Sequence, residues 1–250
     1  MKLAIICAME EELAAIEAAV SLNLVAKLDK ASNSYAEYKF GEHTIILVVS
    51  GIGKVNAAVT TQILIDNFAP DAIVNVGVAG SLTRDLVFGD VVIATDLVEH
   101  DFDITAFGVP LGQIARMDTF SFAADAKLNE LLHSVSLLNH QVVLGRIVSG
   151  DQFIDDEQKA LFLRNEFKAL ACEMEGAAIA HVCYLNKVPF AVVRSYMAHH
   201  QGMSLLSLGS YLLKQKMQKR FLADPCLQAT ELLLHERIPK VAKFYPNTPE

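Results

Sequence analysis

Continuous apolar runs, separated by segments with helical periodicity, dominate most of this chain. The apolar runs predict strands at residues 2–7, 35–40, 43–49, 72–80, 89–94, 144–149 and 188–194. Helices are predicted from residue 9 onward and at 57–67, 125–139 and 177–185. The runs at 2–7 and 72–80 do not alternate, which is typical of strands buried on both faces of a sheet. Since strands and helices alternate with short connections, the pattern predicts an α/β fold: one three-layer α/β/α domain around a central mixed, twisted sheet.

Residues 196–250 follow the last predicted strand and have a different pattern. Apolar residues between Met203 and Met217 lie mostly at helical spacing, and a second short helix is predicted at about 225–236. The last residues are expected to form a frayed end. We therefore expect a domain at 1–195 and a helical C-terminal tail at 196–250 that packs on it.

Composition restricts the partners and the compartment. Apolar residues make up 52% of the 250 residues, which is ample material for a buried core. A net charge of −8 argues against nucleic acid or a membrane as a partner. With no predicted transmembrane run or signal peptide, and no C-x-x-C pair among the cysteines, we expect a cytoplasmic protein with reduced thiols. His199 and His200 are adjacent and would not share a helix face, so we expect no metal site, and no cofactor is expected.

Two glutamates flank a methionine where a strand or loop gives way to the helix at 177–185. Glu175 is expected near the first turn of this helix, where its negative charge suits the positive helix N-terminus. An ionised carboxylate only accepts hydrogen bonds, so Glu175 is suited to bind a pair of hydroxyls such as a ribose diol. The alternative is that Glu173 and Glu175 are solvated charges at a helix start.

Further candidates lie at the ends of two other predicted strands. Ligands of α/β sheets bind beyond the carboxyl ends of the strands, which places Met9 and Glu12 at the expected site. The alternative is that the three consecutive glutamates only compensate the helix dipole. The loop at 50–56 contains Gly51 and Gly53, which allow close approach of the backbone to a ligand or simply form a tight turn. Its spacing fits neither the P-loop nor the dinucleotide-binding fingerprint.

Six short motifs follow one another along the chain. They are 8–12 (AMEEE), 50–55 (SGIGKV), 77–80 (GVAG), 105–108 (TAFG), 148–154 (VSGDQFI) and 173–175 (EME). In this order they resemble the 5′-methylthioadenosine/S-adenosylhomocysteine nucleosidases, which belong to the nucleoside phosphorylase superfamily. The resemblance covers about residues 1–195, and the motifs are specific as a set although each alone is weak.

The resemblance implies a reaction and its catalytic residues. It implies hydrolysis of the N-glycosidic bond of 5′-methylthioadenosine and S-adenosylhomocysteine, which releases adenine and a thioribose. Glu12 would orient the attacking water, with Arg194 and Glu175 nearby, and Glu175 would bind the ribose hydroxyls. An oxocarbenium-like transition state carries positive charge, which both glutamates would stabilise.

The resemblance also implies substrate contacts by apolar residues. Met9 and Met174 would pack on the sugar, Phe153 would stack on adenine, and the backbone of Ile154 would contact the edge of the base. Ile104 and Phe107 would reach into the 5′-thio pocket of a neighbouring subunit, which implies a homodimer. The other substrate-contacting residues that the resemblance implies are Ile52, Val78 and Glu173.

The chain departs from the family pattern in two places. The family has a general-acid aspartate shortly after the arginine of the last strand, where this chain has Ala198, and it usually has serine where this chain has Val78. From about residue 195 the chain instead resembles the glycoamylase-like part of cyclic β-1,2-glucan synthases, although this part is too short for glycan activity. His199 or His200 could replace the missing acid, or they could be polar residues in a turn.

Three functions follow from these observations. The first is an active nucleosidase acting on adenine thionucleosides. The second is an impaired or inactive homologue that still binds adenine nucleosides. The third is a purine nucleoside phosphorylase, which is disfavoured because the loop at 50–56 contains no arginine to hold phosphate, although Lys54 and Arg194 leave it open.

Overall fold

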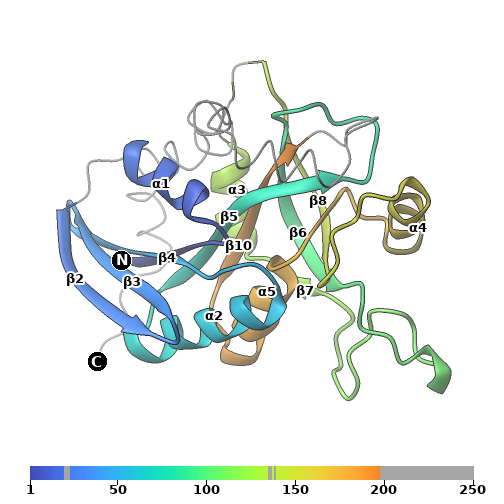
Figure 1. The fold of residues 1–250 in the computed structure, drawn as a ribbon, viewed down its shortest axis with the longest axis horizontal. Coiled ribbons are helices and arrows are strands. Elements are labelled where there is room, and N and C mark those ends of the chain that lie inside the picture. Colours follow the sequence, from blue (N-terminus) through green and yellow to red (C-terminus); the bar gives the residue numbers. More distant parts are fainter. Residues whose placement is uncertain (20–22, 135–136, 138, 198–250) are drawn as a thin grey trace.

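The computed structural model describes residues 1–19, 23–134, 137 and 139–197, and it confirms the α/β fold class (Figure 1). The strands are β1 (Lys2–Cys7), β2 (Asn23–Lys30), β3 (Asn33–Phe40), β4 (His43–Val49), β5 (Ala72–Ser81), β6 (Val91–Glu99), β7 (Phe122–Ala123), β8 (Val142–Ser149), β9 (Ala171–Glu173) and β10 (Phe190–Met197). The helices are α1 (Glu10–Ala19), α2 (Lys54–Phe68), α3 (Ala126–His133), α4 (Glu157–Phe167) and α5 (Gly176–Asn186), with a 3-10 turn η1 at Thr105–Phe107.

The strands form one mixed sheet in the order β10-β6-β8-β9-β5-β1-β4-β3-β2, with β7 added beside β6. Strand β1 runs parallel to β4 and β5, and β5 runs parallel to β10. Strand β10 also pairs antiparallel with β6, so that β5, β10, β6, β8 and β9 close into a ring at one end of the sheet. The sequence predicted a mixed twisted sheet but not this closure, which depends on pairings between distant segments.

Three layers arise from the alternation of side chains along the strands. In β1, Ala4 and Ile6 belong to the core shared with α2 and α5, whereas Leu3 and Ile5 belong to the core shared with α1 and α3. Figure 1 shows α2 and α5 on one side of the sheet and α1 and α3 on the other. Both faces are therefore covered, which explains why the central strands have continuous apolar sequences.

The structure also contains elements that the apolar pattern did not predict. Strand β2 is mostly exposed at the edge of the sheet, so it lacks the apolar run of a core strand. Helix α4 and strand β9 were not predicted either. Helix α3 ends at His133, earlier than the predicted residue 139, and Asn139 has a positive φ of 64° that is incompatible with a continuing helix.

The predicted tail at 196–250 lies, from residue 198 onward, outside the described residues, and so do Ala198, His199 and His200. Among the helices that are described, none is long and apolar enough to cross a bilayer.

Candidate active site

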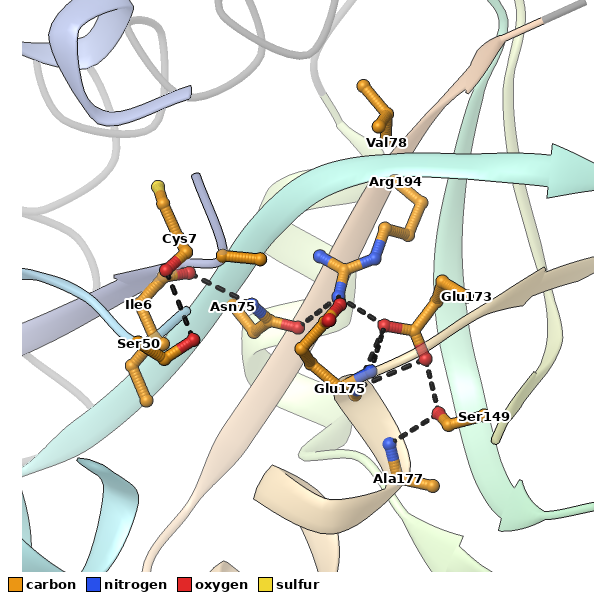
Figure 2. Close-up of polar contacts among 12 residues, drawn as sticks. Ile6, Cys7, Ser50, Asn75, Val78, Ser149, Glu173, Glu175, Ala177 and Arg194 are labelled. Atoms are coloured by element: carbon orange, nitrogen blue, oxygen red, sulfur yellow. Dashed lines mark hydrogen bonds and ion pairs between the residues drawn. The ribbon is translucent and has the colours of Figure 1, made fainter. Parts of the chain in front are cut away.

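Four charged side chains are buried together: Glu12 in α1 just after β1, Glu173 at the end of β9, Glu175 just before α5 and Arg194 within β10. Strands β1, β5 and β10 are parallel, and their register sets the carboxyl end of β1 level with the middle of β5 and β10. Strand β9 runs antiparallel to β5 and brings Glu173 to the same place. Figure 2 shows Arg194 reaching from β10 toward Asn75 of β5 and toward the two glutamates at the start of α5. Buried charges are stable only when they are paired and hydrogen-bonded, so the partners of each group define the site.

Arg194 is held on two sides by protein acceptors. Its Nη2 donates to Glu173 Oε2 at 2.5 Å and to Asn75 Oδ1 at 2.5 Å. The Asn75 amide in turn donates to the backbone oxygen of Ile6 at 2.9 Å, which links Arg194 to β1. Burial alone would lower the pKa of Arg194, but the surrounding carboxylates raise it, so the guanidinium stays charged.

Glu173 is surrounded by protein donors. Besides the hydrogen bond from Arg194, its carboxylate accepts one from the Ser149 hydroxyl. Its Oε2 also accepts hydrogen bonds from the backbone N–H of Glu175 at 3.0 Å and from that of Gly176 at 2.8 Å. Burial would raise the pKa of Glu173, but Arg194 and these hydrogen bonds hold it below its usual value. Glu173 is therefore an ionised residue that anchors Arg194 and the start of α5.

Glu12 is turned back toward the end of β1 by backbone donors. Its Oε2 accepts from the N–H groups of Ala8 at 2.9 Å and Met9 at 3.1 Å, and its Oε1 accepts from Val78 at 3.1 Å. Burial raises the pKa of Glu12 and outweighs the opposing effects of Arg194 and the backbone hydrogen bonds. A buried carboxylate with a raised pKa is suited to accept a proton from water near neutral pH.

Glu175 immediately precedes α5, and among the described residues only one of its two carboxylate oxygens accepts a hydrogen bond. Its Oε1 accepts from the backbone N–H of Gly53 at 2.8 Å, whereas Oε2 is 3.9 Å from Arg194 Nη2, too far for a hydrogen bond. Burial and the negative charge of Glu173 raise the pKa of Glu175 to about 7, against the opposing effect of Arg194. Oε2 can therefore accept a hydrogen bond from a ligand hydroxyl when the carboxylate is ionised.

The remaining predicted site residues lie around this cluster at different depths. Met9 and Met174 are half-buried close to the glutamates in sequence, and half-buried Val78 contacts Glu12 through its backbone N–H. Ile154 packs partly against the core. Ile52 and Phe153 are each 55% exposed, and Phe107 is 84% exposed on η1, which directly follows Ile104. The structure thus brings the charged residues together and leaves Ile52, Phe107 and Phe153 on the surface; the substrate contacts of all these residues stay predictions.

Sequence reasoning missed Asn75 and Ser149, which hold Arg194 and Glu173. Asn75 is a buried amide inside the otherwise apolar strand β5, and a polar residue in such a strand needs a partner, so its position was a usable signal. Ser149 had no comparable signal because serine at a strand end is common in turns. Within the described ranges, no group of three or more His, Cys, Asp or Glu side chains is arranged to hold a metal ion.

The chain is similar to known proteins over most of its length. The family model described as the phosphorylase superfamily matches residues 2–210. The 5′-methylthioadenosine/S-adenosylhomocysteine nucleosidase of Shewanella pealeana is 39% identical over 223 residues, covering 86% of this chain and 93% of the relative. The aminodeoxyfutalosine nucleosidase of Campylobacter jejuni is 41% identical over 196 residues, covering 78% of this chain and 84% of the relative.

A solved structure has the same fold. A mutant of the Helicobacter pylori nucleosidase, crystallised with 5′-methylthioadenosine in the active site, superposes with a TM-score of 0.82 at 32% identity. The match covers 92% of this chain and 97% of the other. The family match continues past residue 195, and the comparisons do not support the resemblance of the tail to cyclic β-1,2-glucan synthases.

Proposed function

This chain belongs to the 5′-methylthioadenosine/S-adenosylhomocysteine nucleosidase family of the phosphorylase superfamily, and we propose that it hydrolyses the N-glycosidic bond of adenine thionucleosides. The products are free adenine and a thioribose. The substrates are 5′-methylthioadenosine and S-adenosylhomocysteine, the compounds in the names of its relatives. Because another relative is an aminodeoxyfutalosine nucleosidase, aminodeoxyfutalosine is a third substrate to test.

One observation supports this proposal most strongly: two buried glutamates, Glu12 and Glu175, lie around the buried guanidinium of Arg194. The negative charges stabilise the positive charge that develops on the ribose ring as the glycosidic bond breaks. Oε2 of Glu175 accepts a hydrogen bond from a ribose hydroxyl, since Oε1 of Glu175 already accepts one from the Gly53 N–H. Preorganised charges in a water-poor site act more strongly than they would in water.

In the proposed reaction the C–N bond between ribose and adenine breaks and a C–O bond forms from water. Glu12 orients this water and accepts its proton, which its raised pKa favours. The departing adenine must gain a proton, and the family uses an aspartate for this step where this chain has Ala198. General acids typically contribute about 10²–10⁴-fold, so the source of this proton decides how active the chain is.

An impaired homologue that binds adenine nucleosides is the second candidate, because Ala198 has no acidic group. A phosphorylase is disfavoured further by the position of Lys54. Its ammonium group is bonded to Glu99 at 3.0 Å and to Asp101 at 2.6 Å, so its charge is already neutralised.

The test is adenine release from each of the three nucleosides by the purified chain, with and without phosphate. Matched variants are Glu12→Gln and Ala198→Asp. Turnover that Glu12→Gln abolishes and phosphate does not accelerate supports the hydrolase. A silent chain that Ala198→Asp activates supports the impaired homologue. Silence of every variant, with no nucleoside binding by calorimetry, contradicts both candidates.

We also propose that the chain acts as a cytoplasmic homodimer. An apolar stripe on the surface at the start of α2 supports a second copy as the partner: Ile52, Val55 and Val59 lie three and four residues apart, and Val55 is 73% exposed. Phe107, which is 84% exposed, would then reach the neighbouring subunit together with Ile104. This arrangement would complete the 5′-thio pocket across the interface.

A further inference from the structure

A closed ring of polar contacts lies beside the candidate active site and involves Lys54, the first residue of α2. Lys54 Nζ bonds Asp101 Oδ1 at 2.6 Å. Asp101 Oδ2 accepts the backbone N–H of Asp151 at 2.8 Å. Asp151 Oδ1 accepts the backbone N–H of Lys54 at 2.8 Å, which closes the ring. Both the side chain and the backbone of Lys54 are therefore held.

Glu99 at the end of β6 connects this ring to the rest of the fold. Its Oε2 bonds Lys54 Nζ at 3.0 Å, and its Oε1 lies 3.0 Å from Nδ1 of His181 on α5. These side chains are largely buried, with 18% of Lys54 and 11% of Glu99 exposed. The charge of Lys54 thus lies between two carboxylates that would repel each other without it.

The ring adjoins a backbone group that contacts the active site, the N–H of Gly53. Gly53 precedes Lys54, and its N–H donates to Glu175 Oε1 at 2.8 Å. Gly53 has a φ of +100°, which glycine adopts readily but L-residues rarely do, so its backbone is not fixed by the sterics of a side chain and depends on its neighbours. Glycine has no side chain to cap α2, so the carboxylate of Asp151 caps the first helical N–H instead. The orientation of the Gly53 N–H thus depends on how the next residue is fixed.

We propose that Lys54 is a positioning residue, which through the ring with Asp101 and Asp151 holds the Gly53 N–H against Glu175 and so orients Glu175 for the ribose hydroxyls. This inference rests on the proposed function, since it assigns Glu175 to a ribose. Because Oε1 of Glu175 already accepts a hydrogen bond from the Gly53 N–H, Oε2 of Glu175 is the oxygen left for a ligand hydroxyl. Without Lys54 the loop would relax and Glu175 would lose its fixed orientation, while contacts to the base would remain.

The experiment compares the parent chain with Lys54→Met in binding three ligands by calorimetry. The first is a C-nucleoside analogue of 5′-methylthioadenosine, whose carbon–carbon glycosidic bond is not hydrolysed. The second is its 2′,3′-dideoxy counterpart, and the third is adenine. We expect Lys54→Met to lower the affinity for the C-nucleoside about tenfold and the affinities for its dideoxy counterpart and for adenine less than about twofold. The reason is that only the C-nucleoside offers ribose hydroxyls to Glu175.

Two further variants separate positioning from folding. Asp101→Asn opens the ring from the other side and should give the same ligand pattern as Lys54→Met. Arg146→Met is a matched control, because Arg146 forms a comparable half-buried ion pair with Asp96 at 2.5 Å, and its other hydrogen bond goes to the backbone oxygen of Phe167 rather than to the loop at 50–54. It should leave all three affinities within about twofold of the parent.

The outcomes distinguish the inference from the proposed function. Equal weakening of all three ligands, or no weakening of the C-nucleoside, overturns the role of Lys54 even if the parent chain binds ribose normally. A parent chain that binds the C-nucleoside and its dideoxy counterpart equally contradicts the proposed role of Glu175, and the inference falls with it. Selective loss of the ribose-dependent affinity supports both.

Discussion

The carboxylate of Glu12 occupies the space in which a side chain on Gly77 would lie. A β-carbon on residue 77 would be 2.7 Å from Glu12 Oε1 and 3.0 Å from Arg194 Nη1. Atoms at such distances cannot coexist without movement. The close approach of strand β5 to the charged cluster therefore requires glycine at this position, although its backbone φ is an ordinary one for any residue.

Gly77→Ala should consequently impair catalysis more than folding. The added methyl group displaces Glu12 from its position beside Arg194, and a misplacement of about 1 Å can cost about 10²-fold in rate. We expect kcat for adenine release to fall by about that factor while Tm changes by only a few degrees. Steady-state kinetics and thermal unfolding check this; an unchanged kcat would contradict the assigned position of Glu12. Gly41→Ala, in the turn between β3 and β4, is the control for destabilisation alone: nothing lies within 4 Å of the added β-carbon but φ is +56°, so Tm should fall while kcat stays unchanged.

Arg194→Met should strongly destabilise the protein, because it leaves Glu173 as a buried charge without its cation. Removal of one partner of a buried ion pair typically costs about 3–5 kcal/mol. We expect the double variant with Glu173→Gln to recover part of this loss, since the neutral amide needs no cation. Denaturant unfolding of the single and double variants measures the coupling, and additive losses would show that the two residues act independently.

Nucleoside affinity should rise with pH through the titration of Glu175. Burial and the charge of Glu173 raise its pKa to about 7, and only the ionised carboxylate accepts hydrogen bonds with both oxygens. We expect the affinity for a non-hydrolysable nucleoside to increase between about pH 6 and about pH 8. Calorimetric titration across this range tests the expectation, with adenine as the ligand whose affinity should change less.

Glu175 also predicts the direction of a stability change with pH. Its pKa is higher in the folded chain than the ordinary glutamate value of 4.5, so the folded state binds more protons between that value and about 7. The free energy of unfolding should therefore fall as pH rises through this window, and each unit of pKa shift corresponds to about 1.4 kcal/mol. Glu175→Gln should flatten the pH dependence. A slope that is unaffected by the substitution would show that other groups cause it.

Val55→Glu should dissociate the proposed homodimer. The side chain is 73% exposed on α2, so the substitution leaves the subunit fold intact but buries a charge at the apolar interface. We expect the dimer dissociation constant to rise more than about tenfold by analytical ultracentrifugation, with weaker binding of the 5′-thio group. Val25→Glu is the control, because Val25 is 62% exposed on β2, at the far edge of the sheet. An equal effect of both variants would contradict an interface on α2.

The local pattern predicted those elements whose sequences reflect burial. Strands β1 and β5 were predicted because both faces of each are covered, which makes their sequences continuously apolar. Strand β2 was missed because it is exposed at the sheet edge. The rule that ligands bind at the carboxyl ends of strands placed Glu12 near the site, but the resemblance to a known family supplied its role. The residue contacts to substrate stay predictions.

The amino-acid sequence by itself determined the fold class, the strand ends that carry the glutamates and the family to which the chain belongs. Only the tertiary structure decided which charges meet. Lys54 finds its partners 45, 47 and 97 residues away, and no local pattern encodes such pairings. The tertiary structure also decided that Glu173 has a lowered pKa and Glu175 a raised one, although only one residue separates them. The physical reason is that a pKa depends on burial and on charges nearby in space, and folding sets both.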